Sequence, residues 1–131
     1  MNNELTTMHE IAMEFVDEAR LAKKRGDHHT TRLFFQKALN LEKLVALGIP
    51  KGNTYQLTRS VFFRSAASIA LNCACYVETI QLVELAIASN PHPAILPELE
   101  ELAKLAKEQQ NLAERRRKVT GRLIAADLPN H

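Results

Sequence analysis

Two stretches of the sequence that match each other at a fixed offset decide the fold. "FVDEARLAKKRGDHHTTRLFFQKALNLE" runs from Phe15 to Glu42, and "FRSAASIALNCACYVETIQLVELAIASNP" runs from Phe63 to Pro91. Matched residues lie 48 positions apart; the pairs are Phe15 with Phe63, Ala19 with Ala67, Ala22 with Ala70, Thr31 with Thr79, Phe35 with Val83 and Ala38 with Ala86. Small residues at regular steps in both copies predict two antiparallel helix pairs whose helices approach closely.

Turn-forming residues divide the rest of the chain in the same way. The sequence holds only four glycines and five prolines, and it is rich in Ala, Leu, Glu, Lys and Arg, which favour helices. We predict a first helix pair over residues 7–47, a second over 53–90, a capping helix over 93–119 and a tail over 120–131. Thr7 and Glu10 fit a capping box for the first helix, and Asp27 can cap the second. The predicted fold class is therefore all-α, in one domain.

The predicted core lies where the paired helices meet. We expect burial between helices for Phe15, Phe35, Phe63, Ala19, Ala38, Ala67 and Ala86. Leu99, Leu102 and Ala106 form a stripe with which the fifth helix would cover the stack. Leu105 and Leu112 lie off this stripe and are candidates for contact with a second chain, which would give a homodimer.

Composition limits the classes of function. The net charge is +2 at pH 7, which is too small to imply nucleic-acid binding by itself. The sequence has no apolar run of 18 residues, so we expect no membrane span. Its polar start, "MNNELTTMHE", does not resemble a signal peptide. We therefore expect a cytoplasmic protein whose thiols stay reduced.

The two cysteines, Cys73 and Cys75, stand at the predicted turn of the second helix pair. Small residues are needed there because the helices converge, and a free cysteine behaves as a small buried hydrophobe. His28 and His29 occupy the corresponding turn of the first pair, so a zinc set of two Cys and two His is the alternative. A C-x-C spacing is unusual for structural zinc, and C-x-x-C is absent. We favour the packing role and expect neither metal nor cofactor.

No catalytic motif is present. Ser60, Ser65 and Ser68 lie within a predicted helix and lack a G-x-S-x-G elbow. The glycines are scattered and begin no phosphate-binding loop. His9 follows a polar first turn and is expected on the solvated surface. We therefore expect that the protein is not an enzyme.

The two helix pairs resemble the tetratricopeptide repeat. The first unit supplies Phe15, Ala19, the Gly26-Asp27 turn, Phe35 and Ala38. The second supplies Phe63, Ala67, Tyr76, Ala86 and Pro91, so that the resemblance covers about residues 12–91. It implies right-handed stacking of the pairs and a groove, lined by the first helix of each pair, that binds a protein or peptide.

The resemblance also implies which residues line that groove: Met13, Val16, Arg20, Lys23 and Lys24 from the first unit, with Val61, Arg64, Ser68, Leu71 and Asn72 from the second. Its polar members, Arg20, Lys23, Lys24, Arg64, Ser68 and Asn72, are the candidate partner-binding residues. This lining is basic, so we expect an acidic partner, whose carboxylates arginine can bind through two hydrogen bonds.

The fifth helix ends in a second basic patch, Arg115, Arg116, Arg117 and Lys118, followed by Arg122. Basic side chains at a helix end suit the helix dipole. They could also contact phosphates or an acidic protein. No aromatic residues alternate with them, which argues against base stacking. The sequence thus favours a protein–protein interaction module, and nucleic-acid binding through this patch is the alternative.

Overall fold

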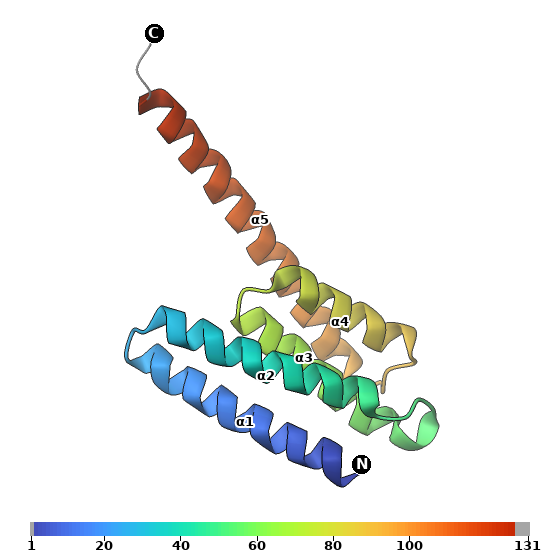
Figure 1. Ribbon diagram of the computed structural model, residues 1–131. Coiled ribbons are helices and arrows are strands. Elements are labelled where there is room, and N and C mark those ends of the chain that lie inside the picture. Colours follow the sequence, from blue (N-terminus) through green and yellow to red (C-terminus); the bar gives the residue numbers. More distant parts are fainter. Residues whose placement is uncertain (1, 128–131) are drawn as a thin grey trace.

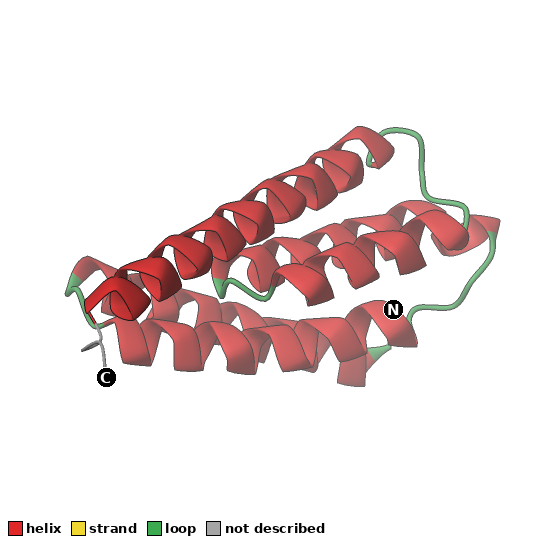
Figure 2. Cartoon of the chain, turned by 90° about the horizontal axis from the view of Figure 1, so that it is seen from above, coloured by secondary structure: helices red, strands yellow, loops and turns green. Residues whose placement is uncertain are grey.

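The computed structural model describes residues 2–127, and all its regular elements are helices (Figures 1 and 2). The elements are α1 (Asn3–Lys24), α2 (His28–Gly48), a single 3₁₀ turn η1 (Asn53–Tyr55), α3 (Gln56–Asn72), α4 (Tyr76–Ala88) and α5 (Leu96–Asp127). The predicted all-α fold class is confirmed. None of the helices in this described part has an apolar stretch long enough to cross a bilayer.

The helices pack in the order of the chain. α1 packs on α2, α2 on α3, α3 on α4, and α5 on α4 and α3. In Figure 1 the first half of α5 lies against the second hairpin, while its second half extends away from the other helices. The arrangement is two helical hairpins, α1–α2 and α3–α4, followed by one long helix.

Two predicted helix boundaries are wrong. α1 begins four residues before Thr7, because Asn2 rather than Thr7 caps it: the Asn2 Oδ1 accepts a 2.8 Å hydrogen bond from the Leu5 amide. α5 runs to Asp127, so residues 120–127 are helical and not a tail. Gly121 does not end this helix, since a lone glycine inside a helix costs only about 1 kcal/mol. Residues 128–131 of the predicted tail lie outside the described part.

The two hairpin turns follow the same backbone path at the predicted 48-residue offset. Gly26 and Ala74 both have left-handed φ angles, 75° and 59°. The Asp27 amide donates to the Ala22 carbonyl at 3.0 Å, and the Cys75 amide donates to the Ala70 carbonyl at 2.9 Å. The hydroxyls of Thr31 and Thr79 then donate to the carbonyls of Asp27 and Cys75. The internal offset therefore holds at the level of individual backbone hydrogen bonds.

Most of the predicted core is buried. Phe35, Phe63, Ala19, Ala38, Ala67 and Ala86 are each at most 4% exposed. Phe15 is the exception: it is only partly buried, because the inward face of α1 is centred on Ala12, Val16, Ala19 and Ala22. Phe15 packs against the edge of the core and stacks on Phe34, with ring centroids 5.9 Å apart.

The loop between α4 and α5 is tied back to the start of α3, which fixes where α5 begins. The Ser60 hydroxyl donates to the Gln56 carbonyl at 2.8 Å and accepts from the His92 amide at 2.9 Å. Leu99 and Ala106 are fully buried, and Leu102 packs against the same core. The first half of α5 therefore covers the stack, as predicted. The prediction is wrong for residues 107–119, none of which is buried.

Candidate functional site

A groove between α1, α3 and α5 forms a hollow with a volume of about 570 Å³. Its floor is apolar and comes from all these helices and α2. Polar side chains of α1, α3 and α5 surround this floor. The full lining is Met13, Val16, Arg20, Phe35, Arg64, Ser65, Ser68, Ile69, Asn72, Pro97, Glu98, Glu101 and Leu102.

The structure brings together much of the groove that the resemblance implies. Arg20, Arg64, Ser68 and Asn72 line the hollow with Met13 and Val16. Lys23 does not; it lines a smaller hollow of about 230 Å³ beside the turns. Lys24, Val61 and Leu71 line neither of these two hollows. The structure thus shows where these residues lie. That they bind a partner stays a prediction.

The expectation of a basic lining is wrong, because α5 contributes two carboxylates. Arg64 forms an ion pair of 2.5 Å with Glu98 across the mouth of the groove. Glu101, one helical turn further along α5, lines the same hollow. Arg20 forms no ion pair with the described residues. The charges of the lining therefore balance, and Arg20 is the cation left to interact with a ligand.

A buried carboxylate lies behind the groove. Glu42 of α2 is fully buried, and its Oε2 accepts a 2.6 Å hydrogen bond from the hydroxyl of Ser65, which lines the groove. The His9 Nδ1 lies 2.9 Å from Glu42 Oε1. His9 is therefore not a solvated surface residue, as expected, but is half-buried with its ring edge-on to Phe62. The cluster links α1, α2 and α3.

The order of groups in this cluster suits structure better than catalysis. A nucleophilic serine needs its base within hydrogen-bond reach, with a third group orienting that base. Here the carboxylate stands between Ser65 and His9 and contacts both. The serine proton is thus directed into the core, away from the groove. A buried carboxylate needs such partners, since an uncompensated buried charge is costly.

The cysteine turn packs against the first hairpin. Cys73 is buried and its thiol donates to the Ile69 carbonyl, while the half-buried Cys75 thiol lies 3.5 Å from Gln36 Oε1 of α2. Burial, with the nearby Cys75 thiol, raises the pKa of the Cys73 thiol to about 12. His28 and Cys73 do line one small hollow, so the two turns lie at the same end. Among residues 2–127 no three Cys, His, Asp or Glu side chains are placed to hold a metal ion.

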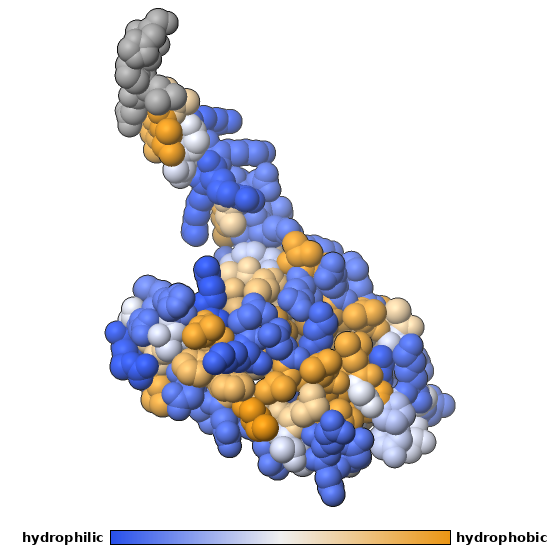
Figure 3. All heavy atoms as spheres, in the orientation of Figure 1, coloured by the Kyte–Doolittle hydropathy of each residue, from blue (hydrophilic) through white to orange (hydrophobic). Residues whose placement is uncertain are grey.

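The second basic patch stands on the projecting half of α5. Arg115, Arg116, Arg117 and Lys118 are all exposed, as is Arg122. Arg117 pairs with Glu114 at 3.5 Å on the helix surface. Figure 3 shows hydrophilic and hydrophobic residues side by side on this projecting half. The patch is thus separate from the groove.

Comparisons of the chain with protein-family models, with curated proteins and with solved structures found no significant match. The site is therefore defined by its own geometry.

Two parts of the site were missed in the sequence. Glu42 follows Phe35, Ala38 and Leu39 at steps that place it on the buried face of α2. That spacing could have identified it as a buried carboxylate needing a partner. Glu98 and Glu101 looked like ordinary first-turn acids of α5. Only the packing of α5 on α3 turns them toward the groove.

Proposed function

We propose that the protein is a binding module that holds a segment of another protein in the groove between α1, α3 and α5, without catalysis. The observation that supports this best is the hollow of about 570 Å³ with its apolar floor. Concave apolar sites with a few placed polar groups are typical of binding sites. The tetratricopeptide-like sequence pattern favours the same groove, because ligands of that family lie against the first helix of each pair.

The lining favours a particular kind of segment. Met13, Val16 and Leu102 offer apolar contacts to one or two hydrophobic side chains of a ligand. Arg20 has no ion-pair partner in the described chain and can bind a carboxylate. Glu98 and Glu101 would repel a strongly acidic ligand, so the expected acidic partner becomes a mainly apolar segment with one carboxylate. We expect micromolar affinity, about −8 kcal/mol.

The proposal can be tested by filling the groove with a large side chain. Ser68→Trp would place an indole in the hollow while leaving Glu42, Arg64 and Glu98 unsubstituted. Gln81→Trp, on an exposed position of α4 outside the hollow, is the matched control. We expect a pull-down from the native host to recover partners with the wild type and the control, and to lose them with Ser68→Trp. If a folded Ser68→Trp variant keeps every partner, the groove is not the binding site.

The basic patch supports a second candidate function. The five cations of Arg115–Lys118 and Arg122 are exposed on a projecting helix, where phosphates of a nucleic acid could reach them. A gel shift with a salt titration would test this: binding that weakens steeply with salt and is lost on replacing Arg115 and Arg116 by Glu would favour nucleic acid. Binding that is absent at low salt would exclude this candidate.

We further propose that the module works in a reducing, cytoplasmic setting. Cys73 and Cys75 are both free thiols, and thiols persist where glutathione keeps them reduced.

A further inference from the structure

The described second half of α5, from residue 107, has no buried residue, and only its start, up to Asn111, lines a hollow with α4. Ala106 is the last fully buried residue of the helix, and between residues 107 and 126 only Gln110 and Ala113 are even half-buried. At about 1.5 Å per residue this half is roughly 30 Å long. A solvated helix of that length gains little stability by itself, and amphipathic helices are usually stabilised by burying one face.

An apolar stripe with a seven-residue spacing begins at the half-buried Leu105 and continues along this half. Leu105, Leu112 and Val119 stand on one face, and we call them the α5 seam. Leu112 is 39% and Val119 is 52% exposed. A shallow hollow of about 290 Å³ lies along the seam between Leu112 and Val119. Paired helices usually carry two apolar residues in every seven. This seam supplies one of the two, and charged residues occupy the second position.

Charged residues with the same spacing run beside the seam. They are Glu101, Glu108, Arg115 and Arg122, in that order, and all four are exposed. The row is therefore acidic near the body and basic near the far end. Polar residues at such positions cost stability but specify the register and the choice of partner.

We propose that α5 pairs antiparallel with α5 of a second copy of this chain through the seam. Placing Leu112 against Leu112 of the second copy sets Leu105 against its Val119. The same register sets Glu108 against Arg115 and Glu101 against Arg122 of the second copy. Each acidic residue of the row therefore faces a basic residue of the second copy when the two helices run in opposite directions.

The parallel arrangement is disfavoured by the same row. It would place Arg115 beside Arg115 and Glu108 beside Glu108 of the second copy, and like charges across an interface repel. It would also bring both bodies to one end of the pair. In the antiparallel pair the bodies stand at opposite ends, because the seam half extends away from the other helices (Figure 1).

The test measures the mass of the full chain by light scattering and sedimentation at about 50 µM and low salt, where charges are least screened. We expect the wild type at twice the monomer mass of 14.7 kDa. Leu112→Glu should give monomers, whereas Val77→Glu, on an exposed residue of α4, should leave the dimer intact. A wild-type monomer, or a dimer that survives Leu112→Glu, overturns the proposal.

Charge exchange tests the direction of pairing. Glu108→Arg and Arg115→Glu should each weaken the dimer about tenfold or more, because each places two like pairs in the interface. Mixing the two variants should restore a dimer, as should combining both changes in one chain. Failure of the mixture to dimerise overturns the antiparallel register. Leu112 does not line the groove, so the pull-down can be repeated with Leu112→Glu, and a failed groove and a failed seam are distinguishable.

Discussion

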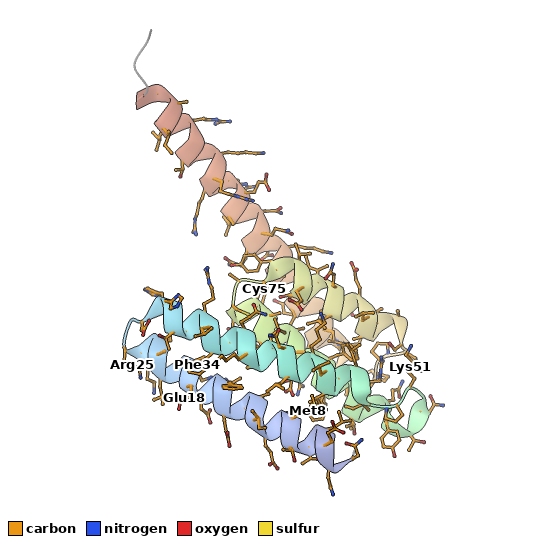
Figure 4. All side chains as sticks on the ribbon, in the orientation of Figure 1. Met8, Glu18, Arg25, Phe34, Lys51 and Cys75 are labelled. Carbon is orange, nitrogen blue, oxygen red and sulfur yellow. The ribbon has the colours of Figure 1, made fainter. Side chains whose placement is uncertain are left out.

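The two hairpin turns of this chain share a backbone path but are stabilised by different means. In the first turn, Gly26 takes up the left-handed conformation and the Asp27 side chain caps α2 by accepting a 3.1 Å hydrogen bond from the Thr30 amide. In the second, Ala74 adopts the left-handed conformation and Cys75 makes no side-chain cap. Arg25 and Cys75, labelled in Figure 4, mark the two turns.

The surroundings explain this difference. The first turn is exposed from Arg25 to His29, so its conformation depends on its own residues. The second is partly covered: Cys73 is buried, and the Cys75 thiol contacts Gln36 of the neighbouring hairpin. Packing against α2 can hold a turn whose local sequence is unfavourable. A repeated backbone path therefore does not require repeated turn residues when tertiary contacts hold the turn in place.

The largest expected effect on stability comes from the close helix contacts that the turns allow. Ala67 and Ala19 lie at these contacts, and both are 0% exposed. Ala67→Leu should cost about 1–3 kcal/mol of unfolding free energy, because a filled core cannot accept three extra carbons. Ala19→Leu should cost less, since α1 packs mainly on α2 while α3 packs on α2, α4 and α5. Urea unfolding measures both. An unchanged midpoint for Ala67→Leu would mean that the two repeats are misaligned.

Gly26→Ala measures the cost of the left-handed backbone conformation in the first turn. A Cβ at Gly26 would meet nothing within 4 Å, so the expected loss of about 1–2 kcal/mol is the cost of a left-handed alanine. The control is Gly121→Ala, also in open space but inside α5, where alanine should instead stabilise the helix by about 0.5–1 kcal/mol. Urea unfolding, with circular dichroism for α5, measures both effects.

The reverse substitution, glycine for alanine, can be made in the second turn. Ala74→Gly relieves the left-handed alanine but frees the unfolded chain, so we expect a net gain below about 1 kcal/mol. A loss of stability at this position would show that the Ala74 methyl group packs favourably, contrary to the view that only its backbone conformation matters.

Within the second turn, the two thiols should react at different rates. Burial is the largest of the causes that raise the pKa of Cys73 to about 12, and it persists when Cys75 is replaced. The Cys73 thiol therefore stays protonated at pH 8, and the thiolate is the reactive form. We expect iodoacetamide to modify the Cys75→Ala variant at least about tenfold more slowly than the Cys73→Ala variant. In guanidinium chloride both rates should become equal. Equal rates in the folded state would mean that the turn opens freely.

Much of the fold could be predicted from the sequence, because helix periodicity and turn residues are local signals. The 48-residue offset placed Ala19, Ala67 and both turns correctly. The ends of α1 and α5 were missed: Asn2 is a better cap than the expected Thr7, and Gly121 stays within its helix. Such boundaries depend on small differences in local stability.

The site was less predictable. Arg20, Arg64 and Ser68 were placed in the groove by analogy with a repeat family, and the structure brings them together. The sequence did not show that acidic residues balance the basic residues of the groove lining, because Glu98 comes from a helix more than 30 residues away in sequence from Arg64. The contact between His9 and Glu42 likewise joins α1 to α2 at a distance of 33 residues. Such long-range contacts leave no local pattern in the sequence.

The smallest expected effect is the pH dependence of the Asp27 cap. Hydrogen bonds from the Thr30 hydroxyl and amide lower the pKa of Asp27 below its usual value, so the folded state favours the ionised form. A lowered folded pKa means that the stabilisation is present above the unfolded pKa of about 3.9 and is lost as pH falls through the folded pKa. Asp27→Ala should therefore lower the Tm at pH 7, and its difference from the wild type should shrink steadily below about pH 4.

Two further variants test whether the pH dependence of the Tm comes from the Asp27 cap. Asp17→Ala removes an exposed carboxylate from the middle of α1, where it caps no helix, and should change the Tm little at any pH. Cys75→Asp places a carboxylate at the equivalent position of the second turn, before Glu78. If the turns are equivalent, it should raise the Tm at pH 7 and lose that gain in acid. A Tm gain that persists at pH 2 would mean that the cap acts through packing rather than through its charge.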